Sequence, residues 1–237
     1  MSEILCKNIK VTYVLKHNNF VDGLDGLSIC FNDNRVNVIF GENGCGKTTL
    51  FNCIIGLLGY DGEITFDGVD ANSLDVVERK ISYVPQSLNL LPKFTVFDNI
   101  ALPLKNLKFK PQEILKRVYP MLEKFQIQHL INCLPNQISI GQQQKVCIAK
   151  ALISEPRIII LDEAFSNIDP VNRRFIQKII KEYVKETKCN VIYVTHDIPD
   201  AQFFGDYFFV INNREVLYES SKKKLAIHKL EKLVVKK

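Results

Sequence analysis

The sequence predicts an α/β fold in which a mostly parallel sheet is covered by helices. Three short runs rich in β-branched residues carry this prediction, namely VNVIF at 36–40, RIIIL at 157–161 and NVIYVT at 190–195. They are continuously apolar rather than alternating, as expected of strands buried on both faces. Each run is followed by a helical pattern, so any ligand should bind beyond the carboxyl ends of the strands.

Two regions depart from this alternation. The first sixty or so residues contain ICFND and the turn-rich DGEITFDGVD, which predict an N-terminal antiparallel β subdomain. Between Pro85 and about Gln137, the segments FDNIALPL and PQEILKRVYPMLEKF have helical spacing with proline breaks, which indicates an inserted α-helical subdomain. We therefore expect one domain over 1–220, with the helical subdomain at about 88–153.

The remaining residues, 221–237, are basic and predict a C-terminal helix or tail. Leucines at 225, 230 and 233 favour a helix packed on the body, and a helix lying on a membrane surface is the alternative.

Composition excludes several classes of protein. Of the 237 residues, 46% are hydrophobic and 24% charged, as in ordinary soluble domains, and no apolar run approaches the ~20 residues of a membrane span. The N-terminus lacks the apolar core of a secretory signal, so we expect a cytoplasmic chain. The seven cysteines are scattered without a CxxC pair, which argues against a zinc site or a disulfide framework. Lysine and arginine exceed aspartate and glutamate, 31 to 26, which suits an acidic ligand or a membrane surface.

The segment GENGCGKT at 41–48 fits the phosphate-loop pattern G-x-x-x-x-G-K-[ST], between a predicted strand and a predicted helix. Glycines let backbone N–H groups curl around phosphate oxygens, and the helix N-terminus adds its positive end. We expect Lys47 to reach the β- and γ-phosphates of a nucleotide and the Thr48 hydroxyl to hold Mg²⁺. The predicted binding residues here are Gly41, Glu42, Asn43, Gly44, Cys45, Gly46, Lys47, Thr48 and Thr49. The context disfavours a Gly-rich turn with a solvated lysine, so the pattern predicts a P-loop NTPase core.

Two carboxylates follow the second apolar run, in RIIILDEAFSNID. Asp162 ends the run, where it can reach Mg²⁺ directly or through water. Glu163 follows it and is placed to polarise an attacking water, which favours hydrolysis over nucleotide storage. Helix N-capping is the alternative for such a pair, and the phosphate loop upstream weakens it.

With these residues in place, the chain resembles the ATP-binding subunits of ABC transporters over residues 3 to about 220. YVPQ resembles the family's Q-loop, SNID its D-loop, VTHD its switch histidine and ISIGQQQKVCIAKAL its signature motif. The resemblance implies catalytic roles for Gln86, Glu163 and His196, metal contacts for Thr48, Gln86 and Asp162, and a nucleotide contact for Asp169. A histidine that caps a strand end is the alternative for His196.

An aromatic residue before the phosphate loop is also implied. Tyr13 matches the family's adenine platform in position, and a base can stack on an aromatic face. Phe20 competes for that role, and a buried core tyrosine is the alternative for Tyr13.

The stretch ISIGQQQ at 138–144 has two interpretations. Ser139 and Gln142 form the S-x-x-Q capping box of an amphipathic helix with Val146, Ala149 and Ile153 on one face. The resemblance implies in addition that Ser139, Gly141 and Gln142 contact the ATP held by a partner subunit in a head-to-tail dimer. Ile140 stands where the family usually has glycine, so we expect a negative φ there and a side chain directed away from the nucleotide.

The resemblance implies an ATP-hydrolysing subunit that uses ATP and Mg²⁺, dimerises with itself or a homologous subunit, and drives separate integral membrane permeases from the inner face of the cell membrane. LNLLPKFTVFDNIALPL after Gln86 is a suitable docking surface, and a buried helical core is an equal alternative for much of it. The segment resembles the subgroup for lipoprotein release or peptide and macrolide export, while import stays open. A soluble ABC-type ATPase acting on DNA or ribosomes is the alternative. The single cassette and the short segment between Gln86 and Ser139 disfavour it, and we expect no nucleic-acid partner. A P-loop kinase or GTPase would leave 138–144 unexplained.

Overall fold

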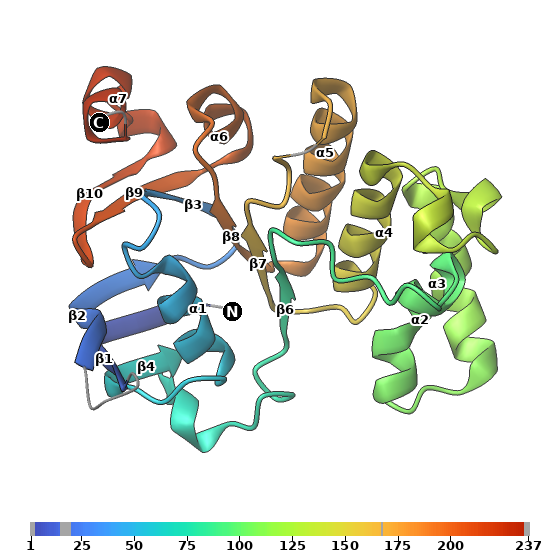
Figure 1. Cartoon of the computed structure of the whole chain (residues 1–237), viewed down its shortest axis with the longest axis horizontal. Helices are drawn as coiled ribbons and strands as arrows, with labels where there is room; N and C mark the ends of the chain where they lie inside the picture. Colours follow the sequence, from blue (N-terminus) through green and yellow to red (C-terminus); the bar gives the residue numbers. More distant parts are fainter. Residues whose placement is uncertain (1–2, 15–19, 167, 235–237) are drawn as a thin grey trace.

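The computed structural model describes residues 3–14, 20–166 and 168–234 (Figure 1). An antiparallel sheet is formed near the N-terminus by β1 (Ile4–Val14), β2 (Phe20–Phe31), β4 (Asp61–Phe66) and β5 (Val69–Asp70), in the order β2-β1-β4-β5. The short 3-10 helix η2 (Ala71–Ser73) follows it. The predicted hairpins at the N-terminal end of the chain are therefore confirmed.

A second sheet of six strands is the centre of the molecule, in the order β10-β9-β3-β8-β7-β6. Its members are β3 (Val36–Gly41), β6 (Ile81–Val84), β7 (Ile158–Asp162), β8 (Asn190–Val194), β9 (Tyr207–Asn212) and β10 (Glu215–Ser221). All neighbours are parallel except the β9–β10 pair. The three predicted apolar runs are β3, β7 and β8, so the mostly parallel sheet is confirmed. The same register places Asp162 beside Val194 and Gly41 beside Ile211, which gathers these strand ends at one edge.

The six-stranded sheet separates two hydrophobic cores. In β7, Ile159 and Leu161 belong to one cluster, whereas Ile158 and Ile160 belong to the other. The first cluster contains the helices on one face, and the second contains the helix α1 (Lys47–Ile55) and the antiparallel sheet. Burial on both faces explains why these strands are continuously apolar.

The helical insertion consists of α2 (Val96–Asn106), α3 (Pro111–Lys124) and α4 (Ile140–Leu152), on the right in Figure 1, with short 3-10 turns at Gln128–Leu130 and Pro135–Gln137. The expected proline breaks are wrong in two places, because Pro103 lies inside α2 and Pro120 inside α3. Each proline removes one helical N–H, but buried side chains flank both positions. Tertiary packing therefore holds these helices where sequence propensity alone would end them.

The second half of the chain adds α5 (Pro170–Thr187), α6 (Ile198–Phe204), a 3-10 turn η5 (Lys222–Lys224) and α7 (Ile227–Val234). Leu230 of α7 is fully buried, and Leu225 and Leu233 pack partly against the same core. The basic C-terminal segment thus lies on the body of the molecule as far as residue 234. Across the described ranges, no helix combines the length and the apolar character that a membrane crossing requires.

Candidate functional site

The phosphate loop connects β3 to α1. The N-cap of α1 is Gly46, with φ of 98°, and a Cβ at this position would lie 2.6 Å from Leu24 Cδ2 and 2.9 Å from the Gly23 carbonyl oxygen. Only glycine fits that conformation and that space. The Lys47 ammonium is buried and donates to the carbonyls of Gly41 at 2.8 Å and Glu42 at 2.7 Å. The loop therefore places a fixed cation at the positive end of a helix, an arrangement that binds phosphate.

A cavity of about 330 Å³ opens in front of this loop. Its walls include eight residues predicted to bind nucleotide: Tyr13, Asn43, Gly44, Gly46, Lys47, Thr48, Thr49 and Gln86. They also include the predicted metal ligand Asp162 and the predicted base Glu163. Glu42 and Cys45 line an adjoining cavity of about 430 Å³ instead, and Gly41 ends β3 with its carbonyl on Lys47. The loop therefore borders two cavities, and the predicted catalytic and metal-binding side chains that lie near it, Thr48, Gln86, Asp162 and Glu163, line the first one.

Tyr13 lies in the wall of the first cavity rather than in the core. Its hydroxyl is 3.0 Å from the Thr49 hydroxyl, which fixes the ring beside the start of α1. The ring is partly exposed, in contrast to the core-tyrosine alternative. The side chain of the competing Phe20 lies outside the described residues, and stacking of a base on Tyr13 stays a prediction.

Asp162 ends β7 at the cavity, and its Oδ2 accepts a hydrogen bond of 3.0 Å from the Tyr83 hydroxyl. Burial raises the pKa of the Asp162 carboxyl, and the charge of Glu163 adds to that increase, whereas the Tyr83 bond and Lys47 oppose it. Sequence analysis missed Tyr83. Its place in YVPQ, three residues before Gln86 on a strand adjacent to β7, is the signal that could have identified it.

Glu163 is held by its backbone conformation and by contacts with two other side chains. Its backbone is left-handed, with φ of 49°, a conformation that costs about 1–2 kcal/mol for a residue with a side chain. The Glu163 carboxylate accepts from Gln86 Nε2 at 3.0 Å on one oxygen and lies 2.6 Å from His196 Nε2 on the other. The structure thus brings together the three residues predicted to be catalytic, from three separate segments.

The donors expected to hold Mg²⁺ share the first cavity. Thr48, Gln86 and Asp162 offer a hydroxyl, an amide and a carboxylate, all of them oxygen ligands. Within the described part of the chain, no group of three or more His, Cys, Asp or Glu side chains is arranged to hold a metal alone. Mg²⁺ is typically bound by one or two carboxylates together with substrate phosphates, so this sparse set fits Mg²⁺ that arrives with a nucleotide.

The residues of ISIGQQQ form the capping box expected at the start of α4. The Gln142 backbone N–H donates to Ser139 Oγ at 3.3 Å, and the Ser139 N–H donates to Gln142 Oε1 at 2.9 Å. Ile140 does not have a positive φ, as expected, and its side chain is 55% exposed. Its direction relative to a nucleotide stays a prediction. Apart from its chain neighbours and the nearby backbone of its own helix, a Cβ added to Gly141 would meet no described atom within 4 Å, so packing within the described residues does not require glycine there.

Four predicted nucleotide contacts lie away from the chain's own phosphate loop. Ser139, Gly141 and Gln142 are outside its cavity, and in Figure 1 α1 lies to the left of β6 while α4 lies to its right. Asp169 is also outside and caps α5, where its Oδ1 accepts from the N–H groups of Val171 and Asn172. None of these four residues lines the phosphate-loop cavity of its own chain, and their contact with a nucleotide stays a prediction.

Arg214 was not identified from the sequence, yet it lines both cavities beside the phosphate loop. It lies in the tight turn between β9 and β10, where Asn213 and Arg214 both have positive φ, 45° and 66°. NNR between two strand patterns is a turn signal, but the sequence does not reveal which loop the turn faces.

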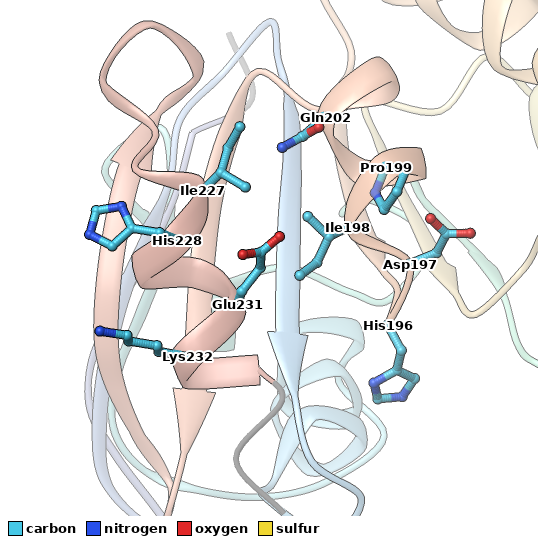
Figure 2. A pocket seen from close by; sticks show the side chains of 9 residues that line it. All are labelled: His196, Asp197, Ile198, Pro199, Gln202, Ile227, His228, Glu231 and Lys232. Carbon is cyan, nitrogen blue, oxygen red and sulfur yellow. The ribbon is translucent and has the colours of Figure 1, made fainter.

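A larger cavity, about 1360 Å³, separates α6 from α7 (Figure 2). Ile198, Pro199 and Gln202 line one wall, and Ile227 and Glu231 line the other. His196 and Asp197 mark its end nearest the Glu163 group. This cavity is lined by no residue of the phosphate loop, and His196 is the one lining residue that contacts Glu163 among the described interactions.

Comparisons with known proteins agree with this geometry. The family model described as "ABC transporter" matches residues 24–166. The chain is 35% identical over 214 residues to the sulfate/thiosulfate import ATP-binding protein CysA of Acinetobacter baylyi, covering 88% of this chain and 61% of that protein. It is 36% identical to the spermidine/putrescine import ATP-binding protein PotA of Hahella chejuensis, covering 80% of this chain and 52% of that protein. The chain thus spans about half to three fifths of the length of these relatives.

Solved structures give the same result. The dimeric structure of the bacterial ABC transporter cassette MJ0796 superposes with a TM-score of 0.83 at 31% identity, covering 94% of this chain and all of that one. A dimeric post-hydrolysis state of the same cassette, bound to ADP and Pi, matches equally well.

Proposed function

Since the chain belongs to the ABC transporter family, we propose that it binds ATP with Mg²⁺ and hydrolyses it as the ATPase subunit of a membrane transporter. The observation that carries this proposal is the Glu163 carboxylate, held between Gln86 and His196 at the mouth of the phosphate-loop cavity. A carboxylate in that position can act on a water molecule that faces the terminal phosphate.

Each residue of the site has a distinct part in the proposed reaction. Lys47 and the loop N–H groups bind the β- and γ-phosphates, and Thr48 and Asp162 hold Mg²⁺, which neutralises charge on the phosphate oxygens when bound. Glu163 takes a proton from the attacking water as the water oxygen bonds to the γ-phosphorus. The bond between the γ-phosphorus and the bridging oxygen breaks, and ADP leaves. Gln86 and His196 orient the Glu163 carboxylate, and His196 also reaches toward the γ-phosphate.

We propose that two copies enclose the nucleotides in a head-to-tail dimer. The start of α4 is a capped helix N-terminus that lies away from its own phosphate loop, and Gly141 leaves its surface open to close approach. An anion fits such a helix end. The dimeric arrangement of the similar cassette MJ0796 supports the same assembly, with this chain or a homologous one as partner.

The transport role rests on the named relatives, which are import ATP-binding proteins. We propose that this chain likewise acts on the inner face of the cell membrane, against separate permease subunits. These relatives favour import, and they give no support to the lipoprotein-release or peptide-export subgroup. ATP turnover that responds to DNA or ribosomes, and never to a co-expressed membrane protein, would replace transport with the alternative function.

The catalytic proposal is tested by Glu163→Gln. We expect this variant to bind ATP and dimerise while its turnover falls by roughly 10²–10⁴-fold, because the amide cannot accept the proton of water. Glu182→Gln on the exposed face of α5 is the matched control and should leave turnover unchanged. Phosphate release and size-exclusion chromatography with ATP measure both effects. Unchanged turnover in Glu163→Gln would refute the role of Glu163.

A further inference from the structure

A cavity of about 730 Å³ lies at the opposite end of β3 from the phosphate loop. Val36, the first residue of β3, is part of its wall, whereas Gly41 ends the strand at the nucleotide site. The cavity is lined by Asn34, Arg35, Val36, Lys181, Val184, Lys185, Lys188, Asp206, Ser221, Lys222 and Lys223. Its volume lies within the roughly 300–1,000 Å³ of small-molecule sites.

The lining is strongly cationic. It contains five lysines and one arginine but a single carboxylate, Asp206. That carboxylate already accepts a hydrogen bond of 3.0 Å from the Val36 N–H. The cations come from the turn before β3, from α5 and from η5, three segments far apart in the sequence. The fold therefore gathers like charges around a concavity. Arg35 and four of the five lysines are exposed to solvent, and a bound anion would offset the repulsion between them.

The pKa of Lys181 is affected by this crowding. Burial lowers the pKa of its ammonium, Asp206 opposes that shift, and the nearby charges of Lys222 and Lys185 lower the pKa further. An anion in the cavity would favour the charged ammonium and so oppose both the effect of burial and the repulsion.

Favourable positions at helix C-termini explain only some of the cations in the lining. Lys181 Nζ donates to the Phe203 carbonyl at 2.9 Å and Lys222 Nζ to the same oxygen at 3.4 Å, near the C-terminus of α6, and Lys185 lies in the last turn of α5. Arg35 and Lys223 have no such explanation. In the described ranges, neither of them forms an ion pair within 4.0 Å.

We propose that this cavity binds a small anion that carries two or more phosphate groups. A single phosphate brings about −1.5 to −2 charges at neutral pH, which leaves most of the lining cations without a counter-ion. A cluster of phosphates matches both the charge and the volume. The ligand is either a free polyphosphate-like anion or a phosphorylated lipid headgroup, which share this chemistry. The site is separate from the nucleotide cavity and does not depend on the proposed ATPase function.

The probe is sodium tripolyphosphate, titrated calorimetrically into three full-length proteins. The first is the wild type. The second is the double variant Lys185→Gln/Lys223→Gln, which removes two exposed cations from the cavity wall. The third is Lys178→Gln/Lys224→Gln, which removes two exposed lysines from the same two elements, outside the wall. Because tripolyphosphate can also enter the phosphate loop, all three proteins are first saturated with ADP and Mg²⁺. Both variants lose the same net charge, so the difference between them reports the cavity.

We expect the cavity variant to bind tripolyphosphate at least about tenfold more weakly than the wild type, because two charge-assisted contacts are lost. The control variant should stay within about twofold, the size of a general charge effect. Equal weakening in both variants, or in neither, would overturn the proposal. ATP turnover should be the same in all three proteins, so a failure of the ATPase proposal is seen separately.

Vesicle sedimentation identifies the source of the phosphates. Vesicles of phosphatidylcholine alone are compared with vesicles that contain a phosphorylated inositol lipid. Retention of the wild type and the control variant, but not the cavity variant, by the phosphorylated vesicles assigns the site to a lipid headgroup. Tripolyphosphate binding without such retention assigns it to a free anion. Lysine footprinting by mass spectrometry gives an independent check, since tripolyphosphate should protect Lys185 and Lys223 and leave Lys178 and Lys224 reactive.

Discussion

The two glycines at positions 46 and 141 have different structural reasons. Gly46 is required by atoms of its own chain, since a Cβ would collide with Leu24 and with the Gly23 carbonyl. Gly141 has no such requirement among the described residues, although it lies in the first turn of α4 and glycine is a poorer helix former than alanine. Its neighbour Ile140 is exposed. Under the proposed dimer, the reason for Gly141 is the nucleotide that the partner holds.

Substitution of Gly141 should therefore separate stability from activity. We expect Gly141→Asp to melt no lower than the wild type, because a carboxylate is favourable at a helix N-terminus and the space is open. Its ATPase activity should be lost, because the added charge repels phosphate. Ile140→Gly should keep measurable ATPase activity. Thermal melts and phosphate release on the same samples check this, and Gly141→Asp with wild-type activity would remove the trans contact from the proposal.

For single residues, the sequence predicts which ones belong to the site better than it predicts which side chains they contact. Glu163, Gln86 and His196 were expected from motifs, and the structure shows that the carboxylate hydrogen-bonds both of the others. The hydrogen bond from Tyr83 to Asp162 and the position of Arg214 beside the loop escaped prediction. Both depend on which strands are neighbours, and a linear motif carries no information about sheet order.

Among the elements, α2 has a role beyond the apolar face that its spacing predicts. The side-chain oxygen of the fully buried Asn99 accepts from the Leu91 N–H, and its nitrogen lies 3.0 or 3.1 Å from the carbonyl oxygens of Leu91, Phe94 and Thr95, which share its two N–H donors. One amide thus fixes the irregular segment between Gln86 and the helical insertion. In the proposed transporter, this segment joins the nucleotide site to the surface that would meet a permease.

Asn99→Ala should lower the free energy of unfolding by about 1–3 kcal/mol, because the Leu91 N–H and the Phe94 carbonyl lose their side-chain partner, whereas the Leu91 and Thr95 carbonyls keep backbone donors. Asn106→Ala, at the exposed end of the same helix, should change it by less than about 0.5 kcal/mol. Urea titrations followed by tyrosine fluorescence measure both. Equal midpoints for the two variants would show that Asn99 does not organise the segment.

Helices and strands were predicted correctly where burial determines the pattern of apolar residues. The prediction failed where packing against distant parts of the chain determines the structure. The runs that became β3, β7 and β8 are continuously apolar because helices or sheets cover both faces. β6 has only four residues and β10 alternates between exposed and partly buried positions, so neither gives the same signal. Pro103 and Pro120 would end isolated helices, and the apolar packing that keeps them helical lies in other parts of the chain.

At the scale of the whole molecule, the six-stranded sheet joins two cores into one body. Ile160 and Leu161 are consecutive and fully buried, and they face opposite clusters. Each cluster is large, so neither side of the sheet is a thin covering over the other. The strands that carry the catalytic side chains are therefore supported from both faces.

Ile160→Ala and Leu161→Ala should each lower the free energy of unfolding by about 2–5 kcal/mol, the usual cost of a large-to-small change in a packed core. Comparable decreases are expected because both sites are fully buried. Leu57→Ala, at a position 68% exposed, is the control and should have little effect. Calorimetric melts test this. A large loss for one substitution and none for the other would mean that the two cores do not unfold together.

The open space at Gly141 has a practical consequence for protein engineering. A screen or a design procedure that scores one isolated copy will find glycine inside a helix with room for a larger side chain, and will replace it. Under the proposed assembly, each round of such optimisation would select chains that tolerate more heat and turn over less ATP. Any effort to stabilise this protein should therefore keep position 141 fixed, or select for catalysis in the assembled form.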